Sequence, residues 1–207
     1  MKKLLAASLL SLVPFATTAG AAVLTATNSD YGVFDASSGT REVTLGAGTI
    51  QDVNITINFA KCDGGAATQQ GCSAGGTPYF NEIVFSLTSP DGTTVNLITA
   101  DLFQTGSTGD VFTITFDDQA ANLLGSLPMS GDYQPAGSLS AFGGENALGT
   151  WSLYVADTVG ADALTFFSYT LEVSVREGNT TVPEPASLGL LGAGLAGLGL
   201  AARRRRK

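Results

Sequence analysis

Four aspartates are the side chains of this sequence that are best suited to bind a ligand. Each follows or precedes a predicted β-strand, and carboxylates on loops are the ligands that Ca²⁺ prefers in proteins. They form a candidate Ca²⁺ site, whose ligands would be Asp117, Asp118, Asp157 and Asp162. The alternative is that each carboxylate accepts hydrogen bonds from backbone N–H groups and only closes a turn.

The chain contains no histidine. Ser-His-Asp and Cys-His catalysis, histidine zinc sites and imidazole pH switches are therefore excluded. A glycosidase needs two carboxylates that face one bond, and Asp117 and Asp118 would point to opposite faces of a strand. The sequence predicts no catalytic residue, and we expect a protein that is not an enzyme.

Two cysteines, Cys62 and Cys72, flank a Gly-rich segment. Their spacing is not that of a Cys-x-x-Cys redox motif, and two thiolates would need further ligands to hold zinc. In an oxidising compartment we expect a disulfide between them, and the short loop that it closes should stabilise the fold by roughly 2–3 kcal/mol.

The chain between its two ends has the pattern of an all-β protein. In residues 53–59 apolar side chains alternate with Asn and Thr, which is the period of a half-buried strand. Further strands are predicted in residues 83–98, 110–116, 150–155 and 166–175, the first of these being a hairpin around Ser89-Pro90-Asp91-Gly92. Many short strands separated by turns indicate a β-sandwich.

Two smaller features complete this pattern. One short helix is expected after Asp118, which would cap it, with Gly125 at its end. Trp151, the only tryptophan, lies on an alternating strand and is predicted to be a core residue.

The charge of residues 22–181, which we call the body of the chain, excludes nucleic acid as a partner. Between residues 22 and 181 three basic residues stand against seventeen acidic ones, a net charge of −14. Such a surface repels phosphate backbones, and it suits cations or simply keeps the protein soluble.

Residues 1–21 are typical of a secretory signal peptide. Two lysines precede an apolar run, and Ala19-Gly20-Ala21 offers small residues for cleavage. We expect a lead-in over residues 22–45, a domain over 46–176 and a linker over 177–181.

The last residues combine a short motif, an apolar run and a basic cluster. The motif is Val182, Pro183, Glu184 and Pro185, and the cluster is Arg203, Arg204, Arg205, Arg206 and Lys207. Between them the apolar run would measure roughly 25 Å as a helix, slightly less than a typical membrane core. The three parts resemble a PEP-CTERM sorting signal, although a plain single-span anchor has the same physical layout. The resemblance implies processing by an exosortase, with the helix inserted transiently in the inner membrane of a Gram-negative bacterium.

The body resembles the P domain that follows the catalytic domain of kexin-like and furin-like proteases. The matching segments are Ser89-Pro90-Asp91-Gly92-Thr93, Thr115-Phe116-Asp117-Asp118, residues 139–144 and residues 149–153. The resemblance implies a jelly-roll-like β-sandwich that stabilises a neighbouring protease and is not itself catalytic. The cystine loop, Leu164 and Tyr169 depart from the family pattern.

These features predict an exported, non-catalytic protein of the cell surface or extracellular matrix. Its P domain would be a stand-alone binding or structural module. Two alternatives stay open: an accessory module that stabilises a separate subtilisin-like protease, and a lectin-like protein that binds exopolysaccharide. Apart from the candidate Ca²⁺, no cofactor is predicted.

Overall fold

Residues 20–64, 66–72, 76–104 and 109–176 are described by a computed structural model. All of them belong to one compact unit. The predicted signal peptide (except its last two residues), linker and sorting helix lie outside the described residues. Within those residues, no helix is both long and apolar enough to cross a membrane.

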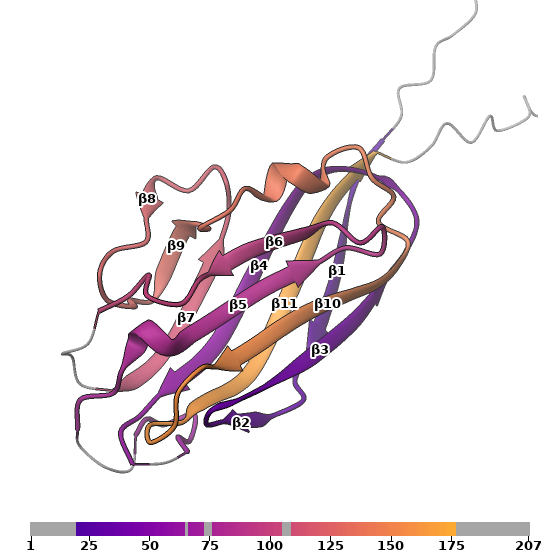
Figure 1. Ribbon diagram of the computed structural model, residues 1–207. Coiled ribbons are helices and arrows are strands. Elements are labelled where there is room, and N and C mark those ends of the chain that lie inside the picture. Colours follow the sequence, from indigo (N-terminus) through magenta and orange to yellow (C-terminus); the bar gives the residue numbers. More distant parts are fainter. Residues whose placement is uncertain (1–19, 65, 73–75, 105–108, 177–207) are drawn as a thin grey trace, which may run out of the picture. The chain divides into compact units, whose positions relative to one another are not determined.

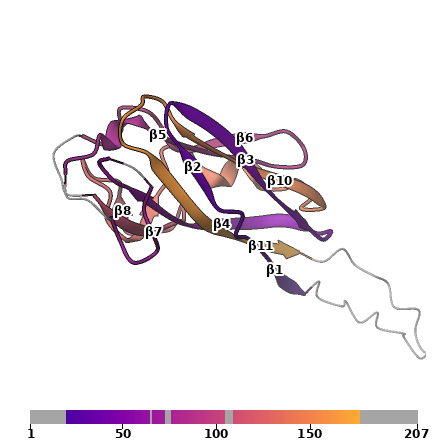
Figure 2. The same cartoon turned by 90° about the horizontal axis from the view of Figure 1, so that it is seen from below.

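The described residues form two β-sheets that lie face to face (Figures 1 and 2). The larger sheet has the order β1-β11-β4-β7-β9-β8, with β2 also paired to β11. Its strands are β1 (Ala21–Asn28), β2 (Gly32–Phe34), β4 (Thr49–Lys61), β7 (Asp110–Phe116), β8 (Asn122–Leu123), β9 (Gly131–Gln134) and β11 (Leu164–Arg176). The smaller sheet has the order β3-β10-β5-β6, from β3 (Ser37–Leu45), β10 (Gly149–Asp157), β5 (Ile83–Thr88) and β6 (Thr94–Ile98).

Two 3₁₀ turns, η1 (Phe80–Glu82) and η2 (Leu139–Phe142), are the helical elements of the described chain. The all-β prediction is therefore confirmed.

The strands pair in a nested way. β1 pairs with β11, β3 with β10, β4 with β7 and β5 with β6, and all four pairs are antiparallel. The segment expected as a lead-in thus contributes β1, β2 and β3, so the two sheets begin before Gly46. The nesting also places Ala21 opposite Arg176, so the first and last described strands are neighbours.

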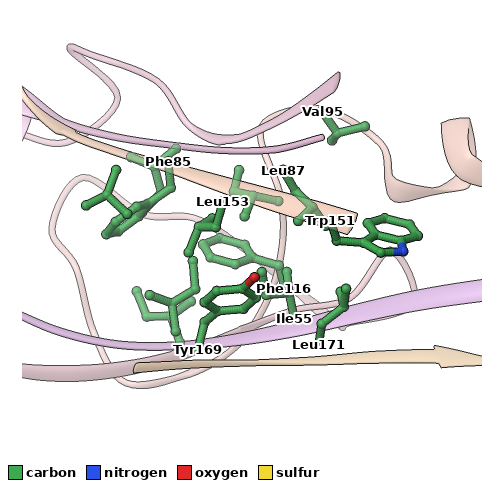
Figure 3. Packing of buried hydrophobic residues seen from close by; sticks show 14 of the residues in the cluster. Ile55, Phe85, Leu87, Val95, Phe116, Trp151, Leu153, Tyr169 and Leu171 are labelled. Carbon is green, nitrogen blue, oxygen red and sulfur yellow. The ribbon is translucent and has the colours of Figure 1, made fainter. Parts of the chain in front are cut away.

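The core lies between the sheets, where the alternating side chains meet (Figure 3). Along β4 the residues Val53, Ile55, Ile57 and Phe59 are buried, as the period of two predicts. Trp151 is also fully buried, and its ring meets Phe142 edge-on with 5.1 Å between the ring centroids. Its indole N–H donates to the Ala147 carbonyl at 3.1 Å, which satisfies the polar atom of this buried ring.

The predicted hairpin is confirmed. β5 and β6 pair around Ser89–Gly92, and the Gly92 N–H donates to the Ser89 carbonyl at 3.0 Å. Gly92 has a φ of 90°, a backbone conformation that favours glycine.

The prediction of a short helix after Asp118 is wrong. The chain makes a turn, in which the Ala120 N–H donates to the Asp117 carbonyl, and then enters the short strand β8. The reason lies in the carboxylate of Asp118, whose hydrogen-bond donors come from residues 138–140 and not from the turn that it would have capped.

Candidate functional site

A buried lysine surrounded by three carboxylates is the most unusual polar feature of the described chain. Lys61 Nζ lies 2.6 Å from Asp157 Oδ2, 2.9 Å from Glu82 Oε2 and 3.5 Å from Asp162 Oδ2. We call these four residues the Lys61 cluster. Lys61 ends β4, Glu82 ends η1, Asp157 ends β10, and Asp162 lies in the loop that leads to β11.

The strand register assembles this cluster. Asp157 is the partner of Ile83 across β10 and β5, which places it next to Glu82. Lys61 is the partner of Leu164 across β4 and β11. The site therefore joins both sheets at one end of the sandwich.

All four side chains are removed from water. Lys61 is 0% exposed, Asp157 1%, Asp162 2% and Glu82 5%. Backbone donors supply further hydrogen bonds to Asp157, from the Val159 N–H to Oδ1 at 3.3 Å and from the Leu164 N–H to Oδ2 at 3.0 Å. One cation thus faces three carboxylates in a medium that penalises unpaired charge.

The pKa values in the cluster reflect this imbalance. Burial disfavours the charged form of Lys61, but its hydrogen bonds to Asp157 and Glu82 outweigh that effect and raise its pKa. Burial raises the pKa of Asp157 and of Glu82, and the attraction of Lys61 only partly offsets it. The lysine is therefore held as an ammonium, while the raised pKa values of Asp157 and Glu82 mean that these two carboxyl groups hold protons more tightly than usual.

The cystine loop, which the disulfide between Cys62 and Cys72 closes, begins directly after Lys61. Cys62 and Cys72 form a disulfide with 5.5 Å between their Cα atoms, as predicted. Within the loop the Ala67 N–H donates to Thr165 Oγ1 at 3.0 Å, and Ala67 packs with Phe167 in a small second core. The loop is thereby fastened to β11 beside the Lys61 cluster.

Asp118 closes a loop at a different place in the sandwich. Its Oδ1 accepts the Leu139 N–H at 2.9 Å, and its Oδ2 accepts the Ser140 N–H at 2.8 Å and the Ser138 hydroxyl at 2.6 Å. We call this arrangement the Asp118 cap. Burial opposes ionisation here, but the three donors outweigh it and lower the pKa of Asp118.

The four predicted Ca²⁺ ligands are thus divided between two places. Asp157 and Asp162 lie in the Lys61 cluster, whereas Asp118 forms its cap near the start of β4 and Asp117 accepts the Gln119 N–H at 2.7 Å. From Asp52, near the cap, to Lys61 the strand extends roughly 30 Å at about 3.3 Å per residue. In the ranges that the structure describes, no three acidic, histidine or cysteine side chains are grouped so as to hold a metal ion. Binding of Ca²⁺ stays a prediction.

Hollows on the surface of the described residues differ in size and lining. A pocket of 80 Å³ lies beside the Asp118 cap, too small for a sugar ring. A more open groove of 260 Å³ runs along the outer face of the smaller sheet, lined by Ser37, Ser38, Tyr154 and Thr158 among others. Tyr154 is 40% exposed there and offers an aromatic surface beside hydroxyl groups.

Sequence reasoning missed Lys61 and Glu82. One signal was present: Lys61 is the only lysine between residues 22 and 181, and it ends a strongly alternating strand. Its partners were hidden, because Glu82 and Asp157 are 21 and 96 residues away along the chain.

Two parts of the chain match known protein families. Residues 76–173 match the proprotein convertase P-domain, and residues 181–206 match the PEP-CTERM protein-sorting motif. The chain carries a P-domain followed by a PEP-CTERM motif. The P-domain match contains Glu82, Asp157 and Asp162 but not Lys61 or the cystine loop. The PEP-CTERM motif implies export, membrane-associated sorting in a Gram-negative bacterium and processing by an exosortase.

Several solved structures align with this chain at low identity and low TM-score. The complex of Aeromonas sobria serine protease with its chaperone is 15% identical, with a TM-score of 0.44, over 79% of this chain and 28% of that one. The same serine protease alone is 16% identical, with a TM-score of 0.42, over 76% of this chain and 27% of that one. A chain in the structure of infectious bursal disease virus, Gx strain, is 14% identical, with a TM-score of 0.31, over 79% of this chain and 34% of that one. The chain spans less than a third of the length of the chain that it matches in each of the two Aeromonas sobria structures. No curated protein matches it.

Proposed function

We propose that this protein is an exported, non-catalytic component of the cell surface or extracellular matrix. Its P-domain acts as a stand-alone binding or structural module, and an exosortase removes the sorting tail. The observation that carries the proposal is the order of the two matches, a P-domain directly followed by a PEP-CTERM motif. The nested strand pairing supports a jelly roll of the P-domain type.

A non-catalytic role agrees with the chemistry of the described residues. The chain has no histidine to activate a nucleophile. The two carboxylate arrangements are already occupied, one by an ammonium group and the other by backbone and hydroxyl donors.

The intact mass of the protein recovered from the cell surface tests the proposal. We expect a chain that has lost its signal peptide and the basic cluster that ends at Lys207. Alanines at Pro183 and Pro185 should leave the tail uncut and the protein in the membrane fraction. Released wild-type protein that still carries Arg203–Lys207 would contradict sorting by an exosortase.

A second candidate function is an accessory module for a separate exported subtilisin-like protease. The match to a domain of proprotein convertases favours it. Affinity purification from the producing cell, washed at high salt, should then retain a subtilase. Recovery without a protease, together with retention on the cell's own exopolysaccharide, favours the binding module instead.

For a lectin-like role, the groove at Tyr154 is the surface with suitable chemistry, because an aromatic ring lies beside Ser37 and Ser38. Tyr154→Ser should reduce retention on exopolysaccharide. Tyr79→Ser is the matched control, since Tyr79 is an exposed tyrosine outside the residues that line the groove. Equal retention of both variants and the wild type would remove the groove from consideration.

The predicted Ca²⁺ site has its own test. Millimolar Ca²⁺ should raise the melting temperature, and a chelator should reverse the rise. Identical melting curves in both conditions would end this prediction.

A further inference from the structure

The Lys61 cluster holds an amine and a carboxyl group in contact, out of reach of water. Lys61 Nζ and Asp157 Oδ2 are 2.6 Å apart, and both side chains are at most 1% exposed. Two groups held in this way react as if at a very high concentration, because no encounter step is needed.

The carboxyl group of Asp157 is also placed to act as an electrophile. The Val159 N–H donates to Oδ1 and the Leu164 N–H donates to Oδ2. Both donors draw electron density from Cγ, and both would stabilise the negative charge that develops on the oxygens during attack.

A proton acceptor completes the arrangement. Glu82 Oε2 lies 2.9 Å from Lys61 Nζ, in direct contact with the ammonium protons. Because burial raises the pKa of Glu82, its carboxylate is a better base than an exposed glutamate.

From this geometry we propose that Lys61 and Asp157 condense to an intramolecular isopeptide bond, with Glu82 as the proton shuttle. The ammonium gives one proton to Glu82, and the freed lone pair attacks Cγ of Asp157. The new N–C bond forms, Nζ loses a second proton, and one C–O bond breaks. The departing oxygen takes both protons and leaves as water, and nothing is oxidised or reduced.

The reaction removes charge from a site where charge is costly. An ammonium and a carboxylate are replaced by a neutral amide, so the desolvation penalty of these two charges is removed. The amide N–H keeps Glu82 as its acceptor, and Asp162 keeps the hydrogen bond that it accepts from the Tyr79 N–H.

The bond would join the two sheets. Lys61 ends β4 of the larger sheet, and Asp157 ends β10 of the smaller one. Residues that are 96 positions apart would become covalently linked across the sandwich. An exported protein would thereby gain a link that reducing agents do not break.

The experiment uses the full chain, purified, unfolded in denaturant and reduced. An ion pair does not survive unfolding, so a free Lys61 is then open to trypsin, which cleaves only after charged lysine or arginine. Arg41, Lys61 and Arg176 are the only basic residues between 22 and 181. We expect residues 42–176 as one uncut fragment whose mass is one water below that calculated.

Two variants sharpen the result. Lys61→Arg keeps the positive charge without a condensing amine, and it should give the full mass and cleavage after position 61. Glu82→Gln keeps the shape of the side chain without its base, and it should greatly slow loss of water. Wild-type protein with the full calculated mass and complete cleavage after Lys61 would overturn the proposal, whatever the stability of the variants.

Discussion

The Lys61 cluster and the Asp118 cap use the same side-chain chemistry with opposite results. In the cluster, burial raises the pKa of Asp157, whereas in the cap three hydrogen-bond donors lower the pKa of Asp118. The cap donors are N–H and O–H groups at 2.6–2.9 Å, and its carboxylate is only half-buried. The donors and the exposure of a carboxylate decide its role, and neither is a property of aspartate itself.

Removal of the buried cation should have the largest effect. Lys61→Met leaves three buried carboxylates without a cation, and it should cost about 3–5 kcal/mol in the free energy of unfolding, measured by urea denaturation. Adding Glu82→Gln and Asp157→Asn to the same chain should recover part of the loss. A change below about 1 kcal/mol in the single variant would mean that water reaches the cluster after all.

The cystine loop next to the cluster should have an intermediate effect. Replacing Cys62 and Cys72 together by serine opens a loop with a sequence separation of 10 and should cost roughly 2–3 kcal/mol. Reducing the wild-type disulfide should reproduce this loss, because the two experiments remove the same constraint.

The Asp118 cap should contribute less than the cluster. Asp118→Ala removes the acceptor for Ser138, Leu139 and Ser140, and it should cost about 1–2 kcal/mol because water replaces part of the lost hydrogen bonds. Asp118→Asn keeps one carbonyl oxygen and should cost less. Equal losses in Asp118→Ala and Lys61→Met would contradict the distinction between the two sites.

The two sites should also respond to pH in opposite directions. The raised pKa of Glu82 means that its contribution to stability is complete below the ordinary value of about 4.3 and is lost as pH rises through the folded value. The lowered pKa of Asp118 means that its contribution is complete above about pH 4 and is lost as pH falls through the folded value. The urea concentration at the midpoint of unfolding should therefore be highest at about pH 4, where both contributions are complete.

The plot of stability against pH has an upper limb, where stability falls as pH rises, and a lower limb, where it falls as pH decreases. Glu82→Gln should flatten the upper limb, and Asp118→Asn should flatten the lower one. If either substitution flattens both limbs, the two sites are coupled and do not titrate independently.

The sequence predicts what depends on neighbouring residues. The alternation along β4 specifies its buried face, and Ser89–Gly92 specify the hairpin, because both signals lie within a few residues. The disulfide is equally local. The structure confirms these three predictions, and none of them required knowing which strands pair.

The sequence does not predict what depends on strand register. The Asp118 cap draws its donors from about twenty residues further along the chain, and this is why a helix was wrongly expected after Asp118. The Lys61 cluster needs Asp157 opposite Ile83 and Lys61 opposite Leu164. A shift of one position in either pair would turn these side chains to other faces of their sheets.

The pairing of β1 with β11 has a mechanical consequence. β11 lies between β1 and β4, antiparallel to both, and Arg176 is its last described residue. A chain held beyond Arg176 and pulled from the opposite end of the sandwich would load β11 along its own axis. The hydrogen bonds on both of its edges would then share the force in shear, and they would not break one after another as in peeling.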